Sequence, residues 1–177
     1  MKLFVMRHGE TDWNRNNRVL GLTDIPLNSS GVEQAKEAAK KLSAVPIKAI
    51  YTSCFTRTID TARIISKFQT NNCKVIPTKA LNEQNFGVFE GVERSDDSYQ
   101  KAKREFFKRY PQGESYFDLA FRVYSFLEDL KSQGDDSALI VTHGGVCRII
   151  ANRYADMDND EFVAFAMKNC EIREYNI

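Results

Sequence analysis

Short apolar runs alternate along the chain with amphipathic segments. The apolar runs are typical of buried strands, and they cover residues 2–6, 49–52, 74–77 and 138–142. The amphipathic segments are typical of helices, and they cover residues 30–42, 56–68, 117–130, 145–154 and 158–167. A loosely alternating tail at residues 170–177 predicts an edge strand. This alternation predicts an α/β three-layer sandwich, in which a mostly parallel central sheet has helices on both faces.

Three of the predicted helices have an apolar face that should pack on the sheet. The first begins with Ser30-Gly31-Val32-Glu33, which has the form of a capping box. The residues expected to point inward are Val32, Ala35, Ala39 and Leu42 in the first, Ile59, Ala62 and Ile65 in the second, and Phe117, Phe121, Tyr124 and Leu127 in the third.

Residues 84–113 fit the alternation least well. This segment is charged, contains aromatic residues and begins with a glycine-rich turn at residues 86–91, and residues 93–104 look like an exposed charged helix. We interpret residues 84–113, called here the cap segment, as a short and partly helical cap over the strand ends. An ordinary surface excursion is the alternative. Because no repeat or linker interrupts the chain, we expect a single domain over residues 1–177.

Composition narrows the classes of function. The chain has 177 residues and a net charge of +1, so no general basic field points to nucleic acid or to a membrane surface, and any anion site must be local. We expect neither a signal peptide nor a membrane span. The four cysteines form no CxxC pair, which indicates free thiols in a reducing cytoplasm. Oligomeric state stays open.

Both histidines occur in the same local setting. His8 is followed by glycine at the end of the first predicted strand, and His143 is followed by Gly144 and Gly145 at the end of the strand at 138–142. In open α/β sheets, ligands bind beyond the carboxyl ends of the strands. Two adjacent strands would place both imidazoles in one crevice, and glycine would permit a close approach of the backbone to a ligand. A hydrogen-bonded structural role is the alternative for either histidine alone.

Two arginines and one helix start could bind an anion near these histidines. Arg57 lies where a strand turns into a helix, and Arg7 precedes His8, although strand alternation turns Arg7 to the opposite face unless the strand has already ended. A guanidinium can bind phosphate oxygens in bidentate fashion. The backbone N–H groups of Gly144 and Gly145 open a helix, which is a natural anion site. The alternative for any single arginine is a solvated surface charge.

Two other phosphate-handling motifs do not fit. A cysteine phosphatase needs a Cys-x5-Arg loop, whereas Cys54 and Arg57 are only three residues apart. A Walker-type loop needs a glycine-rich run ending in Lys-Ser or Lys-Thr, which this sequence lacks. With only two histidines, a His-rich metal cluster is not possible, so we expect no metal ion.

Taken in order, the motifs of this chain resemble those of the histidine phosphatase superfamily, in its phosphoglycerate-mutase-like branch. They are Arg7-His8-Gly9-Glu10-Thr11 with Asn14, Gly21 to Leu27, Gly31 with Gln34-Ala35, Ser53 to Thr58 with Thr61-Ala62, Leu81-Asn82-Glu83, Phe86-Gly87, Glu90-Gly91, Gly113-Glu114-Ser115, and Thr142-His143-Gly144-Gly145. The resemblance spans nearly the whole chain. Each motif alone is moderately specific, but their order and spacing together are highly specific.

The resemblance implies a role for each motif residue. His8 would attack phosphorus and become a phosphohistidine, and Glu83 would protonate the leaving oxygen and later activate water. The phosphoryl oxygens would be surrounded by Arg7, Asn14, Arg57, His143 and Gly144, with a hydroxyl from Thr23. Positive charge on Arg7, Arg57 and a protonated His143 would favour neutral His8. Many relatives have Gln where this chain has Leu20, so that contact is absent or unnecessary here.

The expected activity is a phosphatase acting on a small phosphomonoester, without a cofactor. A phosphoglycerate-type mutase is the alternative, but such mutases have a longer insertion after the glutamate, with paired arginines for a carboxylate. Here the cap segment is short and its basic residues include no adjacent arginine pair. A catalytically silent phospho-ligand binder should have lost His8 or Glu83. The short cap is compatible with an α-ribazole phosphate phosphatase or with a broad-specificity enzyme, and the sequence does not choose between them.

Overall fold

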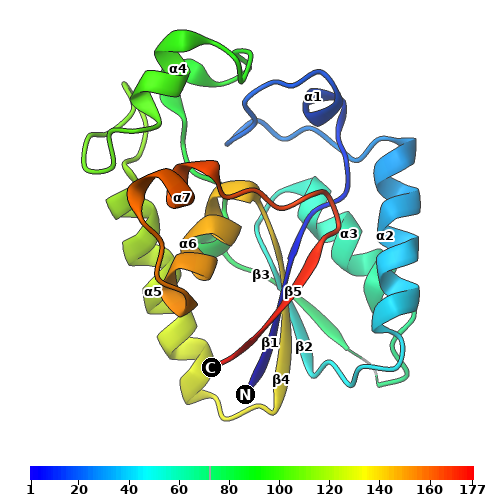
Figure 1. Cartoon of the computed structure of the whole chain (residues 1–177). Coiled ribbons are helices and arrows are strands. Elements are labelled where there is room, and N and C mark those ends of the chain that lie inside the picture. The colour runs from blue at the N-terminus through cyan, green and yellow to red at the C-terminus, as the bar shows by residue number, and fades with distance from the viewer. Residues whose placement is uncertain (72) are drawn as a thin grey trace.

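Five strands form one sheet at the centre of the molecule (Figure 1). The computed structural model describes residues 1–71 and 73–177. The strands are β1 (Lys2–Arg7), β2 (Ala49–Thr52), β3 (Lys74–Pro77), β4 (Ser137–Thr142) and β5 (Ile172–Asn176). They lie in the order β3-β2-β4-β1-β5, and β5 alone is antiparallel to its neighbour. The predicted mostly parallel sheet with a C-terminal edge strand is confirmed.

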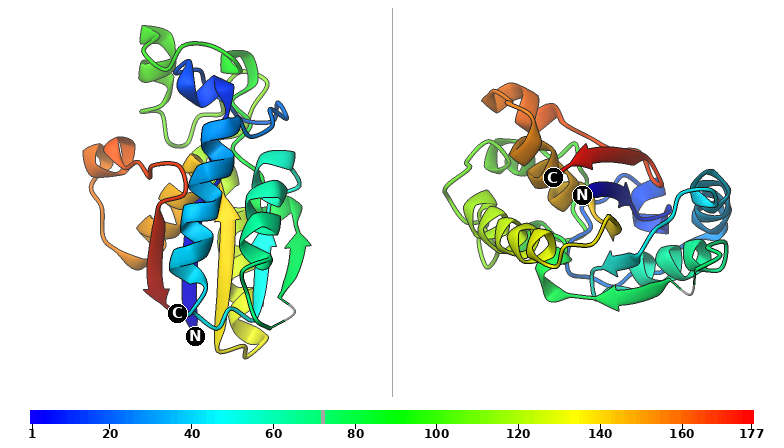
Figure 2. Two further views of the ribbon diagram at one scale, coloured as in Figure 1. Left: turned by 90° about the vertical axis from the view of Figure 1, so that its right-hand side faces the viewer. Right: turned by 90° about the horizontal axis from the view of Figure 1, so that it is seen from below.

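Helices cover both faces of this sheet (Figures 1 and 2). On one face lie α2 (Ser29–Leu42) and α3 (Thr56–Ser66), and on the other lie α5 (Tyr116–Ser132) and α6 (Gly144–Tyr154). The shorter elements are α1 (Asp12–Arg15), α4 (Asp97–Ala102), α7 (Asn159–Ala164) and the 3-10 turns η1 (Lys79–Leu81) and η2 (Gly87–Phe89). The predicted three-layer α/β fold is confirmed. None of the helices among the described residues is long and apolar enough to cross a bilayer.

Alternation along the strands decides which helical layer each side chain joins. Leu3 and Val5 of β1 pack in the core cluster that includes α5 and α6. Phe4 and Met6 pack in the other cluster, with α2 and α3. Because both faces of the sheet are covered, a central strand is apolar at every position instead of at every second one. This explains why β1 and β4 were recognisable from the sequence as short continuous apolar runs.

The ends of several helices differ from the sequence prediction. Asn28 caps α2, because its side chain accepts a hydrogen bond from the Gly31 N–H at 2.9 Å. The capping box predicted at Ser30 is therefore wrong, since Ser30 already lies in the first turn. The helix predicted for residues 56–68 ends at Ser66, and the one predicted for 158–167 ends at Ala164.

The buried face of α5 also differs from the prediction. Phe117 and Phe121 are 67% and 74% exposed instead of buried. The residues that α5 buries are Tyr116, Leu119, Val123, Leu127 and Leu130. Both sets repeat every three or four residues, because this helix is apolar over more than one face. Periodicity alone could not choose between them, and contact with the sheet and α6 decides.

The cap segment runs above the carboxyl ends of the strands (Figure 1). Within the predicted exposed helix at residues 93–104, only Asp97–Ala102 is α-helical, and Tyr99 in it is buried. Tyr99 packs with Val19, Phe86 and Tyr110 in a small apolar cluster separate from the two sheet cores. The segment is partly helical, as predicted, but its helix is shorter and one side of it is buried.

The face of α5 can be tested by comparing two substitutions. Leu119→Ala removes a fully buried side chain, and we expect it to lower the free energy of unfolding by about 2–5 kcal/mol. Phe121→Ala removes a mostly exposed ring, and we expect a change within about 0.5 kcal/mol. Urea denaturation monitored by circular dichroism measures both. A larger loss for Phe121→Ala than for Leu119→Ala would mean that α5 packs through the face predicted from the sequence.

Candidate active site

Parallel pairing of β1 with β4 brings the two His-Gly sequences together. The register pairs Arg7 with Thr142, and the His8 N–H donates to the Thr142 carbonyl at 2.9 Å. His8 and His143 follow directly, so their ring centroids lie 5.2 Å apart with the rings inclined at 62°. Both imidazoles thus lie at the carboxyl edge of the sheet, where the repeated strand-His-Gly pattern predicted them.

The backbone holds His8 in one tautomer. Its Nδ1 lies 2.7 Å from the Gly9 carbonyl oxygen. A carbonyl can only accept, so Nδ1 carries the proton and Nε2 has the free lone pair. Gly9 itself makes a close approach to the backbone of α2, since a Cβ there would lie 2.5 Å from the Gly31 carbonyl oxygen. The structure therefore explains this glycine by helix packing instead of by the expected approach to a ligand.

His143 is held in the opposite tautomer. Arg57 Nε, which can only donate, lies 3.3 Å from His143 Nδ1, so Nδ1 is the acceptor. The proton is then on Nε2, which donates to Ser53 Oγ at 2.8 Å. Ser53 Oγ in turn lies 2.7 Å from Thr58 Oγ1. Both ring nitrogens of His143 are therefore used within the protein.

Burial and nearby arginines keep both imidazoles neutral. Burial is the main cause that lowers the pKa of His8 well below its usual value, and the charges of Arg57 and Arg7 lower it further. Burial and then Arg57 likewise hold the pKa of His143 well below its usual range. The prediction that a protonated His143 would favour neutral His8 is therefore wrong, because His143 is itself neutral. Burial and the arginine charges favour neutral His8 without it.

Arg57 is fully buried behind the histidines. Besides its bond to His143, Nη1 donates to the Thr23 carbonyl at 2.8 Å and Nη2 donates to the Gly21 carbonyl at 2.7 Å. Burial lowers the pKa of Arg57 to about 10, so it stays charged at neutral pH. Thr23 therefore contributes a carbonyl that holds Arg57, and the prediction of its hydroxyl in the pocket is wrong, because Thr23 does not line the cavity.

A cavity of about 200 Å³ lies beside His8, and residues of the strand ends and of the cap segment line it. Its lining residues are Arg7, His8, Asn14, Leu20, Glu83, Phe86, Arg94, Tyr99, Gln100, Lys103, Gly144, Gly145, Arg148, Phe165, Ala166 and Met167. Five of the residues predicted for the site therefore line it, namely Arg7, His8, Asn14, Glu83 and Gly144. The other three, Thr23, Arg57 and His143, are not among the lining residues.

Arg7 and Asn14 line this cavity, and each keeps donors that no described residue uses. Arg7 Nη1 donates to the Met167 carbonyl at 2.9 Å, while its buried Nε has no hydrogen-bond partner among the described residues. The side-chain oxygen of Asn14 accepts from the Thr11 N–H and from Asn169 Nδ2, so its amide nitrogen is free to donate. Despite the strand alternation, the Arg7 side chain therefore reaches the same cavity as His8.

Glu83 is held at the start of α6. One carboxylate oxygen accepts from the Gln84 N–H at 2.8 Å and the other accepts from the Gly145 N–H at 3.0 Å. A Cβ on Gly145 would collide with this carboxylate, which is the reason for glycine at that position. The Gly145 N–H is therefore used by Glu83, and of the two amides predicted as an anion site only that of Gly144 is left at the cavity.

Several lining residues were not predicted from the sequence. Arg148 lies four residues after Gly144, so the two share a face of α6, and this spacing was a usable signal. Arg94 and Lys103 belong to the cap segment, whose basic residues have no local pattern that points to the cavity. Leu20 lines the cavity with an apolar side chain.

A metal site is not formed by the described part of the chain. Among residues 1–71 and 73–177, no group of three or more histidine, cysteine, aspartate or glutamate side chains is arranged to hold a metal ion. The charges that face the cavity are those of the arginines, Lys103 and Glu83.

Known sequences similar to this chain carry mutase names. This chain is 34% identical over 152 residues to a probable phosphoglycerate mutase GpmB of Proteus mirabilis. The matched part covers 81% of this chain and 70% of the relative. The chain is 32% identical over 162 residues to a 2,3-bisphosphoglycerate-dependent phosphoglycerate mutase 2 of Gloeobacter violaceus, which covers 85% of this chain and 74% of that protein.

Several similar solved structures carry phosphatase names. A mycobacterial glucosyl-3-phosphoglycerate phosphatase has a TM-score of 0.85 at 25% identity, covering 98% of this chain and 90% of that one. The α-ribazole phosphatase of Shigella flexneri has a TM-score of 0.83 at 25% identity, covering 100% of this chain and 91% of that one. The family model of the histidine phosphatase superfamily (branch 1) matches residues 3–177. Sequence, fold and the arrangement of the two His-Gly strand ends thus agree that this chain belongs to the histidine phosphatase superfamily.

Proposed function

We propose that this protein hydrolyses a small phosphomonoester through a phosphohistidine intermediate on His8. The observation that carries the proposal is the bond from His8 Nδ1 to the Gly9 carbonyl. It leaves Nε2 as an unprotonated nucleophile in a cavity that is lined by cationic side chains and by Glu83. A neutral imidazole, positive charge for the phosphoryl oxygens and a carboxylic acid are the components that this reaction needs.

In the first step, the lone pair of His8 Nε2 attacks phosphorus and the bond from phosphorus to the ester oxygen breaks. Glu83 gives its proton to the leaving oxygen, so an alcohol departs. The phosphorylated ring gains positive charge, which the Gly9 carbonyl stabilises through the Nδ1–H bond. The side chains of Arg7 and Asn14 and the N–H of Gly144 hold the phosphoryl oxygens, over which charge spreads during transfer.

In the second step, a water molecule attacks the phosphohistidine. Glu83, now a carboxylate, takes a proton from this water, the bond from phosphorus to Nε2 breaks, and inorganic phosphate leaves. Arg57 and His143 lie behind His8 in this scheme. Burial keeps His8 neutral between turnovers, and the positive charge of Arg57 adds to this effect. The bond from Arg57 to His143 fixes the ring that packs edge-on against His8.

Hydrolysis is favoured over the mutase reaction by the short length of the cap segment. A mutase must hold its dephosphorylated intermediate while that molecule reorients, and must keep water from the phosphohistidine. Here the cap segment has a single six-residue helix, α4. The mutase names of the relatives support the alternative. The names of two structural neighbours support α-ribazole phosphate as a specific substrate.

The choice between hydrolysis and isomerisation can be measured on one preparation. We expect phosphate release to dominate with a panel of phosphomonoesters that includes α-ribazole phosphate and the phosphoglycerates. We expect little interconversion of 3- and 2-phosphoglycerate, even with bisphosphoglycerate as primer, because water reaches the phosphohistidine. EDTA should not change either rate. Primer-dependent mutase turnover far above phosphate release would overturn the proposal.

The intermediate can be trapped by rapid quenching with 32P-labelled substrate. We expect label on His8 that is lost in acid and retained in base, as a phosphorus–nitrogen bond requires. The His8→Ala variant should carry no label and turn over at a negligible rate. Asn152→Ala, which changes a polar side chain outside this cavity, serves as the control and should label normally. Undiminished turnover by His8→Ala would contradict the mechanism.

The role of Glu83 can be tested with leaving groups of different basicity. An alkoxide needs a proton as it leaves, whereas nitrophenolate needs little help. We therefore expect Glu83→Gln to slow hydrolysis of alkyl phosphates by about 10²–10⁴-fold and to slow nitrophenyl phosphate much less. Glu93→Gln, at an exposed position, is the matched control and should affect neither substrate. Equal losses on both substrates in Glu83→Gln would indicate a binding or structural role instead.

A further inference from the structure

Glu83 lies between two short 3-10 turns and outside the sheet. The turn η1 ends at Leu81, and the next element, η2, begins at Gly87. The carboxylate of Glu83 accepts from the N–H groups of Gln84 and Gly145. These two bonds orient the end of the side chain, but they cannot fix it unless the backbone of the segment is itself held. Whatever holds this backbone therefore also positions the carboxylate.

The guanidinium of Arg122 on α5 holds three carbonyls of this segment. Its Nη1 donates to the Ala80 carbonyl at 2.8 Å and to the Asn82 carbonyl at 2.7 Å. Its Nη2 donates to the carbonyl of Glu83 itself at 3.1 Å. A single side chain thus binds the backbone on the N-terminal side of the Glu83 carboxylate and at residue 83.

Glu114 binds the rest of the same guanidinium. Arg122 Nε and Nη2 each donate at 3.1 Å to a different carboxylate oxygen of Glu114, which makes a bidentate ion pair. One of these oxygens also accepts from the Asn85 N–H at 2.9 Å, and the Glu114 N–H donates to the Asn85 carbonyl at 2.9 Å. Both charged side chains are mostly buried, so salt screens the pair less than it would on the surface. The chain after Glu83 is therefore bound to the same ion pair as the chain before it.

These bonds use all five N–H donors of Arg122. An arginine has one donor on Nε and two on each terminal nitrogen, and here they meet three carbonyls and two carboxylate oxygens. Arg122 is not among the residues that line the cavity beside His8. With every donor used, its contacts reach the reaction through the segment that carries Glu83. A lysine has three donors on one nitrogen and could not reach the same set of acceptors.

A general acid requires this kind of support. Its proton must lie within hydrogen-bond reach of the leaving oxygen, and a misplacement of about 1 Å can lower a rate by about 100-fold. We propose that Arg122 is a positioning residue for Glu83, which holds the carboxyl group where it can protonate the leaving oxygen and later take a proton from water. This inference rests on the proposed function, because it assumes that Glu83 is the general acid. An arginine that stabilised only the fold would leave the dependence on the leaving group unchanged.

Substitution of Arg122 should reproduce the leaving-group dependence expected for loss of Glu83. Arg122→Lys keeps the positive charge but loses most of the five bonds, and Arg122→Met loses them all. We expect both to lower kcat/KM for alkyl phosphates by about 10- to 100-fold and to lower it much less for nitrophenyl phosphate. Arg122→Lys carries the test if loss of the ion pair prevents Arg122→Met from folding. Arg153→Met is the matched control, since it removes an exposed arginine from its ion pair with Glu128 and should affect neither substrate.

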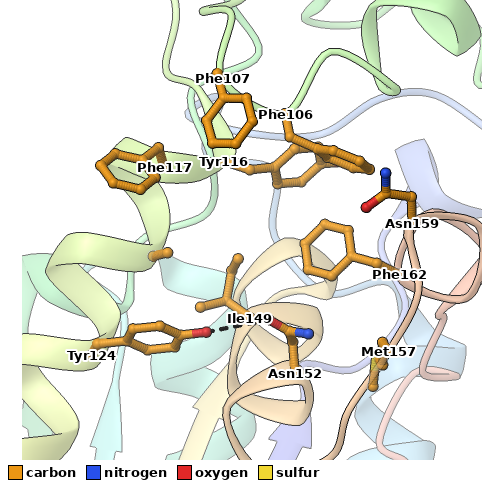
Figure 3. A pocket seen from close by; sticks show the side chains of 11 residues that line it. Phe106, Phe107, Tyr116, Phe117, Tyr124, Ile149, Asn152, Met157, Asn159 and Phe162 are labelled. Atoms are coloured by element: carbon orange, nitrogen blue, oxygen red, sulfur yellow. Dashed lines mark hydrogen bonds between the residues drawn. The ribbon is translucent and has the colours of Figure 1, made fainter.

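A second control comes from the other side of α5. Tyr124 lies two residues after Arg122, so the two side chains point in different directions. It lines a separate aromatic pocket, shown in Figure 3, where its hydroxyl donates to Asn152 Oδ1 at 3.4 Å. Tyr124→Phe removes this hydrogen bond and should keep the wild-type rates with both substrates. It separates loss of the Arg122 bonds from a general loosening of the helix.

A double-mutant cycle tests whether Arg122 acts through Glu83. In the Glu83→Gln background the acid is already lost, so we expect Arg122→Lys to slow alkyl phosphates little further. The two effects should therefore be strongly non-additive, as for residues that act as a unit. Additive losses would mean that Arg122 acts by another route, and they would overturn the inference.

NMR separates this inference from the proposed function, because it needs no turnover. The Gly145 amide proton is bonded to the Glu83 carboxylate, so its signal reports where the carboxylate lies. We expect Arg122→Lys to move this signal toward its position in Glu83→Ala, and Tyr124→Phe to leave it unchanged. A signal that stays in place in Arg122→Lys would overturn the inference, even if Glu83→Gln slowed alkyl phosphates as expected. Equal effects of Glu83→Gln on both leaving groups would contradict the proposed function instead, and the Gly145 signal would still decide whether Arg122 positions the carboxylate.

Discussion

Parallel pairing of β1 with β4 is the constraint on which the candidate site depends. It continues one residue past the strands, where the His8 N–H donates to the Thr142 carbonyl, so His8 and His143 leave the sheet side by side. The register is fixed by burial on both faces, because a slip of one residue would exchange the side chains that pack on α5 and α6 with those that pack on α2 and α3. The position of both imidazoles therefore follows from the packing of the sheet.

The position of Arg57 beside the histidines depends on a loop at residues 21–23, which the carboxylate of Glu90 holds in place. Glu90 of the cap segment accepts hydrogen bonds from the N–H groups of residues 21–23. The carbonyls of Gly21 and Thr23 in this loop then hold buried Arg57, which donates to His143. The cap segment thus has two functions in the fold. It covers the cavity, and through Glu90 it positions Arg57. Burial is the main cause of the lowered pKa of both histidines, and the charge of Arg57 lowers it further.

The two sides of the cavity are built from different elements of the fold. The strand ends supply His8, Arg7 and the Glu83 carboxylate fixed on α6, which are the groups that phosphoryl transfer needs. The opposite side is built from the cap segment, α6 and α7, where carbonyls and aromatic rings orient cations without neutralising them. Relatives of this chain are named as mutases and as phosphatases of different substrates. The side away from the strand ends is where such a difference in substrate can arise without change at His8.

The sequence by itself determined the order of strands and helices and the location of His8, His143 and Glu83, because short-range signals suffice for these. A buried strand is a continuous apolar run, and a His-Gly pair at its end needs no distant partner to be noticed. Only the tertiary structure decided which face α5 buries, since Phe117 and Leu119 both belong to apolar stripes and contact with the sheet selects one. It also decided that Arg57 is held by carbonyls of residues 21 and 23, and that Arg94 and Arg148 meet at one cavity. A side chain's free donors depend on partners far away in the chain, and no local pattern records them.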